Sequence, residues 1–207
     1  IEEQHSFACR KYRTPNFETS WHKHEEYELI LITEGHGTAL IGDYVGEYKT
    51  GDIYFIAGNL PHSFRKRHHK ITGDAIAAHF KKDVFGETFF LAPEIKNIFT
   101  LLNKNDAVQL LNKLKQEVTA LLIEMESAKG FNRINLLLQS LQKMSTSSSY
   151  ARVTEDFSSP DNNINPAIDK IIDYSFKHYL EPVTLQQVAQ IADMSIPTFC
   201  RFFKKNI

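Results

Sequence analysis

Residues 21–28 read WHKHEEYE and residues 51–64 read GDIYFIAGNLPHSF, and the pattern around these two stretches decides the fold. From about residue 5 to residue 82, short runs rich in Ile, Tyr, Phe and Thr alternate with turn-forming Gly, Asn and Asp. The runs predict strands at residues 27–32, 38–41, 44–48, 53–56 and 71–80. Strands at roughly 8–12-residue spacing favour a sandwich or a small barrel over alternating strand and helix units.

Three side chains of the first stretch are suited to binding a metal. Side chains alternate along an extended strand, so His22, His24 and Glu28 point to the same face. Two imidazoles and one carboxylate suit zinc, nickel, iron or manganese better than calcium. The same groups can also hydrogen-bond an organic ligand without a metal, so the residues alone leave both kinds of site open.

The spacing of the two stretches resembles the two-part signature of the cupin family. Glu28 follows His24 after three residues, Gly35 follows after six more, and residues 51–64 match the second part. The resemblance covers about residues 5–82 and implies a jelly-roll barrel of about six to eight strands. It also implies four metal-ligand positions, which are His22, His24, Glu28 and His62. Ala57 stands where the signature has proline and the closing Asn is absent, which argues against an archetypal metal enzyme.

Other side chains of this region complete the predicted ligand-binding domain, residues 1–92. Arg10, Arg13 and Trp21 are candidates to line the mouth of the barrel beside the four ligand positions, where a sugar or an organic acid would bind. His79 is expected to be a barrel histidine satisfied by its neighbours and not a fifth ligand.

The hydrophobic period changes to three or four residues after about residue 94. One stripe consists of Val108, Leu111, Leu114, Val118, Leu121, Leu122 and Met125, and a second of Ile134, Leu137, Leu138, Leu141 and Met144. Lys129-Gly130 lies between them as a helix-stop signal. Residues 93–145 are therefore predicted to form amphipathic helices, whose stripes either pack on their own domain or form the seam of a homodimer.

The remaining sequence divides into a linker and a helical tail. Residues 146–163 are rich in Ser, Pro and Asn without periodicity, which predicts an exposed linker. Residues 164–207 are predicted to hold three helices, which begin at Asn165-Pro166, at the capping box Thr184–Gln187 and at the N-cap Ser195. The third helix is expected to bury Phe199, Phe202 and Phe203.

Residues 185–205 resemble the helix-turn-helix of the AraC/XylS family of bacterial regulators. The matching positions are Ala189, Met194, Ser195, Arg201, Phe203, Lys204 and Lys205. Phe199 replaces a leucine, and Asp193 stands where the family often has glycine in a left-handed turn, which Asp tolerates. The family normally has two such units, and the sequence ends after the first, so this C-terminal domain is expected to be incomplete and to bind DNA poorly.

The resemblance implies a set of DNA-binding residues on the third helix: Ser195, Pro197, Cys200, Arg201, Lys204 and Lys205. Arg201 is the member of this set that can bind guanine with two hydrogen bonds, and the two lysines would contact phosphate. The local charge agrees, because residues 195–207 contain three basic and no acidic side chains.

Composition excludes several classes of protein. Lys plus Arg number 24 against 25 for Asp plus Glu, which excludes a strongly basic, histone-like DNA binder. No run of about 18 apolar residues predicts a membrane span. The N-terminus has no charged-then-apolar leader, and the two cysteines lie far apart, so reduced thiols in a cytoplasmic protein are expected.

Together these patterns predict an α+β chain that regulates transcription and is not an enzyme. A cupin-type barrel at residues 1–92 would bind a small-molecule effector, with or without a Zn, Ni, Fe or Mn ion. Helices at 93–145 would form a homodimer, and residues 164–207 would bind operator DNA. The alternative is a metal-dependent cupin enzyme, a dioxygenase or an isomerase. A third possibility is a sugar- or metal-sensing module that acts through protein partners.

Overall fold

The computed structural model describes residues 6–14, 21–66, 72–86, 88–154, 166–178 and 181–206. Contacts between residues divide the chain into two compact units, one drawn mostly from the residues before 160 and the other mostly from those after. No helix within the described residues is both long enough and apolar enough to cross a membrane.

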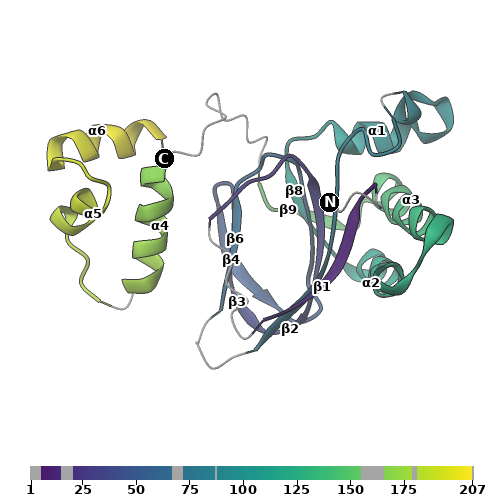
Figure 1. Cartoon of the computed structure of the whole chain (residues 1–207), viewed down its shortest axis with the longest axis horizontal. Helices are drawn as coiled ribbons and strands as arrows, with labels where there is room; N and C mark the ends of the chain where they lie inside the picture. The colour runs from purple at the N-terminus through teal and green to yellow at the C-terminus, as the bar shows by residue number, and fades with distance from the viewer. Residues whose placement is uncertain are drawn as a thin grey trace. The chain divides into compact units, whose positions relative to one another are not determined.

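The first unit is built on two antiparallel sheets (Figure 1). In sheet order, the larger consists of β1 (Ala8–Thr14), β7 (Gly73–Phe80), β2 (Tyr27–Glu34), β5 (Ile53–Ile56), β8 (Ala107–Leu110) and β9 (Tyr150–Arg152). The smaller consists of β4 (Tyr44–Lys49), β3 (His36–Ile41) and β6 (His62–Lys66). The strands predicted at 27–32, 38–41, 44–48 and 53–56 are confirmed, as is the described part of the strand predicted at 71–80.

Side-chain alternation gives the larger sheet two buried faces. On β2, Ile30 and Ile32 belong to a core between the two sheets, and Leu29 and Leu31 belong to a second core on the opposite face. The first core also contains Tyr54 of β5 and Phe64 of β6. A strand that is buried on both faces reads as a continuous apolar run, which explains the sequence YELILIT at the centre of this sheet.

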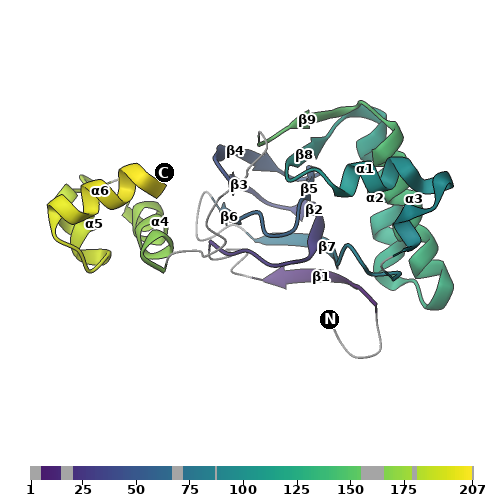
Figure 2. The ribbon, with the colours of Figure 1, turned by 90° about the horizontal axis from the view of Figure 1, so that it is seen from above.

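Helices cover the second face. Two short 3-10 turns, η1 (Phe89–Leu91) and η2 (Pro93–Ile95), lead into α1 (Lys96–Leu102), and α2 (Asn112–Ser127) and α3 (Gly130–Thr146) follow β8. Figure 2 shows these helices on the same side of the larger sheet. The apolar stripes of α2 and α3 lie in one core with the sheet, and Leu122 and Leu137 are fully buried there. The sequence left open whether these stripes pack on their own domain or form the seam of a homodimer, and the structure shows them packed on their own domain. A homodimer stays a prediction, and it would need other side chains.

Two predictions about residues 93–163 are corrected. Val108 was expected in a helical stripe, but it lies in β8 and pairs with Phe55 of β5, and Leu111 precedes α2. The predicted linker at 146–163 contains β9, which pairs with β8, and the buried Thr154, whose hydroxyl accepts a hydrogen bond from the Ala107 amide at 2.9 Å. Strand pairing thus overrides the serine-rich composition up to Thr154, and residues 155–163 lie outside the described part.

The second unit contains α4 (Pro166–His178), α5 (Leu185–Ile191) and α6 (Ile196–Asn206) around a small core that includes Ile171, Ala189 and Phe199. The capping box at Thr184 is confirmed, because its hydroxyl accepts from the Gln187 amide while the Gln187 side chain accepts from the Thr184 amide. Asp193 has the left-handed φ that was expected, at 56°. Asn165, predicted as an N-cap, lies outside the described residues.

One core prediction for this unit is wrong. Phe199 is buried and Phe202 partly buried, but 38% of Phe203 is exposed. Phe203 follows Phe199 by one helical turn plus a fraction, so it lies at the edge of the buried face, where the core is too small to cover it.

Candidate functional site

The turn between β5 and β6 positions the candidate site. A Cβ at Gly58 would lie 2.3 Å from the backbone oxygen of Glu25, so only glycine lets the turn approach the segment before β2 this closely. The next residue, Asn59, donates a backbone hydrogen bond to the His24 carbonyl at 2.7 Å. These contacts hold His24 beside the first residue of β6, His62.

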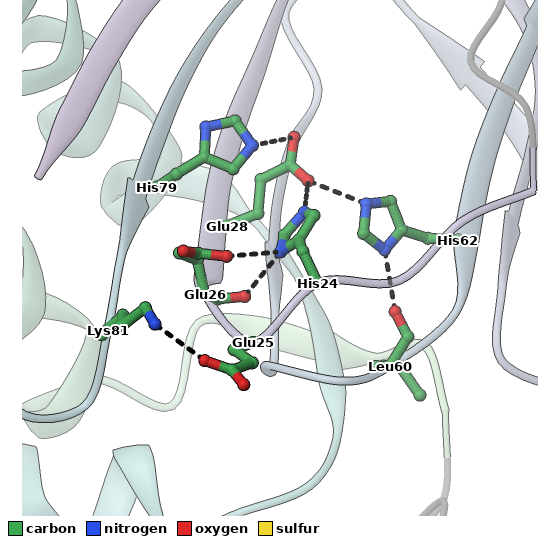
Figure 3. A network of polar contacts seen from close by, with 8 residues as sticks. All are labelled: His24, Glu25, Glu26, Glu28, Leu60, His62, His79 and Lys81. Atoms are coloured by element: carbon green, nitrogen blue, oxygen red, sulfur yellow. Dashed lines mark hydrogen bonds and ion pairs between the residues drawn. The ribbon is translucent and has the colours of Figure 1, made fainter. Parts of the chain in front are cut away.

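Three imidazoles surround one buried carboxylate (Figure 3). The Nε2 atoms of His62 and His24 lie 2.9 Å and 3.4 Å from Oε2 of Glu28. The third ring, His79, has its Nε2 atom 3.6 Å from the other carboxylate oxygen, Oε1. We call these four residues the Glu28 cluster. Its depth is uneven, because the His62 side chain is 1% exposed and those of His24 and His79 are 22% and 20% exposed.

Backbone carbonyls fix the orientation of two of the rings. His24 Nδ1 donates to the Glu26 carbonyl at 2.9 Å, and His62 Nδ1 donates to the Leu60 carbonyl at 2.8 Å. A carbonyl only accepts, so in the neutral ring the lone pair is on Nε2, facing the Glu28 carboxylate. Two electron-rich groups at this distance repel each other unless a proton or a cation lies between them. The donor set and the outer hydrogen bonds therefore fit a divalent transition metal.

The same contacts shift the pKa values of Glu28 and His24. Burial acts to raise the pKa of Glu28, but hydrogen bonds from His24, His62 and His79 outweigh it and hold the pKa well below its ordinary value. Burial acts to lower the pKa of His24, but its hydrogen bond to Glu28 and the Glu28 charge raise it above the ordinary value. The cluster thus attracts positive charge.

The structure brings the four predicted ligands into two overlapping groups and adds a residue to them. Ligand atoms of His22, His24 and His62 lie within 4.8 Å of one another, and so do those of His24, Glu28 and His79. His79 was expected to be a barrel histidine satisfied by its neighbours, and the neighbour it contacts is this carboxylate. The signal that finds it is strand register, since His79 on β7 pairs with Glu28 on β2.

The three residues predicted to line the mouth of the barrel behave differently from one another. On β1, Arg10 pairs with Ala77 and is exposed, on the same side of the strand as the cluster. Arg13 instead pairs with Asp74, and its Nε lies 3.5 Å from that carboxylate, on the opposite face. Its predicted place beside the ligand positions is therefore not what the structure shows.

Trp21 is buried, with 9% exposed. A residue that the sequence reasoning missed is Tyr12, whose ring packs edge-on against His79 at 6.3 Å between centroids.

The residues predicted to contact DNA form an exposed face of α6. Pro197, Cys200, Arg201 and Lys204 are all exposed; Cys200 and Arg201 lie three and four residues after Pro197, and Lys204 lies four and three residues after them, so all four share one helix face. Ser195 caps the helix, with its hydroxyl accepting from the Thr198 amide at 3.4 Å. The side chain of Lys205 lies outside the described part. Phe199 faces the opposite side, into the core of the unit.

Comparison with known proteins gives one family match. Residues 4–71 match the family model described as the AraC-like ligand binding domain. No curated protein matches the chain in sequence.

Three solved structures show distant similarity. The AraC-like transcriptional activator CuxR is 10% identical, with 98% of this chain and 72% of that chain covered and a TM-score of 0.47. ToxT from Vibrio cholerae O395 is 11% identical, with 97% and 75% covered and a TM-score of 0.46. A cupin 2 conserved barrel domain protein from Rhodopseudomonas palustris is 20% identical, with 39% and 55% covered and a TM-score of 0.34. At these values the similarity carries no functional conclusion, and the family match to residues 4–71 is the stronger finding.

Proposed function

We propose that this protein is a cytoplasmic transcription regulator that binds a small-molecule effector in its first unit and operator DNA through its second. The observation that carries the proposal is the combination, in one chain, of a match to an AraC-like ligand binding domain and a separate three-helix unit. Ligand binding would favour one arrangement of the DNA-binding units in a homodimer over another, which is how a ligand changes affinity at a distant site.

The DNA-binding part of the proposal rests on α5 and α6. A four-residue connection, residues 192–195, joins the two helices, and the left-handed Asp193 makes this turn. In a helix-turn-helix the second helix enters the major groove and reads bases with its outward side chains. On α6 these are Pro197, Cys200 and Arg201, and Lys204 lies one turn further along, where it would contact phosphate. The sequence of α6 contains no acidic residue to oppose the approach of DNA.

Selection of DNA from a random library by the purified chain tests this part directly. We expect enrichment of a defined sequence, and on that sequence Arg201→Ala should lower affinity by about 10- to 100-fold, the range for one bidentate base contact. Binding to random DNA should change much less. The matched control is Lys113→Ala, which removes a positive charge from an 85% exposed side chain of α2. If no sequence is enriched, or if both variants weaken every DNA equally, base reading by α6 is refuted.

For the first unit we propose that the sugar or organic acid binds at the Glu28 cluster, where a Zn, Ni, Fe or Mn ion is held by His22, His24, Glu28 and His62. The bound metal would supply a Lewis-acidic centre for the carboxylate or hydroxyl groups of the effector. The protein's part is to orient the rings, through the carbonyls of Glu26 and Leu60, and to exclude water at the buried His62 side.

Elemental analysis of the purified chain tests the metal, and thermal shifts against sugars and acids test the effector. About one equivalent of metal that is lost in His62→Ala supports the site. Absence of metal, together with stabilisation by a sugar or acid, would refute the metal and keep the effector site. An effector that binds without changing DNA affinity would refute the regulatory coupling.

The Glu28 cluster also favours a second candidate function, a metal-dependent dioxygenase or isomerase. Imidazoles and a carboxylate that leave coordination positions open are typical of non-haem iron oxygenases. Turnover by the iron-loaded chain that is lost in His62→Ala would support this candidate. If turnover is found, the chain would be a regulator as well only if α6 is required for DNA binding and its loss leaves the turnover unchanged.

A further inference from the structure

His79 occupies a position that neither cupin stretch contains. It lies near the end of β7, directly opposite Glu28 of β2 in the strand register. Ala75 and Ala77, four and two residues earlier on β7, belong to the core between the sheets. Alternation therefore places the His79 side chain on the interior face, the face that also carries Glu28.

Neighbouring rings hold His79 toward the cluster. The His24 and His79 rings make an edge contact at 5.1 Å between centroids, and Tyr12 makes a second edge contact with His79 at 6.3 Å. The Nε2 atom of His79 is 3.6 Å from Oε1 of Glu28. Figure 3 shows the His79 ring on the opposite side of the carboxylate from His62.

The separations around Glu28 match the edges of a coordination polyhedron. With metal–ligand bonds of about 2.1 Å, two neighbouring ligand atoms lie about 3.0 Å apart in an octahedron and about 3.4 Å apart in a tetrahedron. The nitrogen–oxygen distances from Glu28 to His62, His24 and His79 are 2.9, 3.4 and 3.6 Å. The last is longer than an ordinary hydrogen bond, yet it is within about 0.2 Å of the separation that a shared ion requires.

The buried negative charge of Glu28 also favours several imidazoles around it. Glu28 is 5% exposed, and burial of a carboxylate is strongly unfavourable unless cations or donors surround it. A divalent ion bound by one carboxylate leaves a net positive charge, which neutral imidazoles stabilise without adding charge of their own.

From this geometry we infer that His79 is a further ligand of the metal, binding through Nε2 together with His24 and Glu28. The inference rests on the metal site proposed above and extends it to a strand outside the cupin-like stretches. An ion held by His24, Glu28 and His79 would join the segment before β2 to β2 and β7 of the larger sheet. Metal binding would then stabilise this end of the larger sheet.

Metal titration of the full-length chain tests the inference. The metal-free protein is titrated with Zn²⁺ against a chromophoric chelator, and Co²⁺ is added separately because its visible spectrum reports the number and kind of ligands. The variants are His79→Ala and His79→Gln, with His62→Ala as the positive control. The matched negative control is His36→Ala, an exposed histidine on β3 of the same unit.

We expect one equivalent of Zn²⁺ in the wild-type chain and in His36→Ala. Both His79 variants should bind Zn²⁺ at least about tenfold more weakly and give an altered Co²⁺ spectrum. Their melting temperatures without metal check that they fold, and His79→Gln keeps a side chain of similar reach if His79→Ala does not. Wild-type affinity and spectrum in both variants, with binding lost in His62→Ala, would overturn the role of His79 alone. A wild-type chain that binds neither ion would overturn the metal site as well, and neither result bears on DNA binding.

Discussion

Replacing Leu122 with alanine tests whether the stripe of α2 is part of the domain core. Leu122 is fully buried in the core between the larger sheet and the helices, which also contains Leu137 and Leu141 of α3. Leu→Ala at such sites costs about 2–5 kcal/mol, and a site enclosed by a sheet and a second helix collapses poorly, so we expect about 3 kcal/mol. For a domain of this size that corresponds to a fall of roughly 6–12 °C in melting temperature.

The neighbouring residue supplies the control. Ile123 is 53% exposed, so Ile123→Ala should change the free energy of unfolding by less than about 0.5 kcal/mol. Urea unfolding followed by circular dichroism, at two protein concentrations tenfold apart, measures both variants. If Leu122 lay in a dimer seam, the unfolding midpoint would depend on protein concentration in the wild-type chain and lose that dependence in Leu122→Ala, because dissociation is coupled to unfolding. That result, or equal losses in the two variants, would refute burial within one chain.

Three further predictions concern other parts of the chain. Gly58→Ala should weaken Zn²⁺ binding although it removes no ligand. The new Cβ would lie 2.3 Å from the backbone oxygen of Glu25, so the segment that carries His24 would have to move; competition with a chelator measures the loss. Thr184→Ala should lower the stability of the second unit by about 1 kcal/mol, while serine at this position preserves the cap; thermal unfolding distinguishes them. Burial raises the pKa of Cys9 to about 11, so at pH 8 its thiol stays neutral and only the exposed Cys200 should react quickly with a thiol reagent; two fast thiols would contradict this.

The sequence allowed the sheets to be predicted better than the helical region, and the reason is local. Strands such as β3 and β4 are bounded by turn residues that have a required geometry, for example Gly42 with its φ of 58°. Between Val108 and the buried residues of α2 the chain turns at Asn112, which has a φ of 50°, and a lone Asn is a weaker turn signal than a glycine. A short apolar run reads equally well as strand or helix, and pairing of β8 with β5, far away in the sequence, decides it.

The candidate site was predictable to the extent that its residues are close in sequence. His24 was predicted to share a strand face with Glu28, but it lies before β2, and the turn at Gly58-Asn59 brings it to the carboxylate; His62 was implied by the spacing of the second cupin-like stretch. His79 has no such spacing, since its place depends on which residue of β2 it meets. That register is set when the whole sheet forms, with a one-residue slip turning every side chain to the other face. No single-sequence pattern contains this information.

Glu28 explains why these histidines converge. It is the first interior-facing residue of β2, whose two neighbours in the sheet, β5 and β7, both pair with it at that position. A buried charge there is tolerated only if groups from several elements reach it, and the three rings come from the segment before β2, from β6 and from β7. The carboxylate thus links side chains whose order in the chain is unrelated. A ligand or ion that changes its charge balance therefore acts on both sheets at once, which is the property an effector site needs if its occupancy is to alter the domain as a whole.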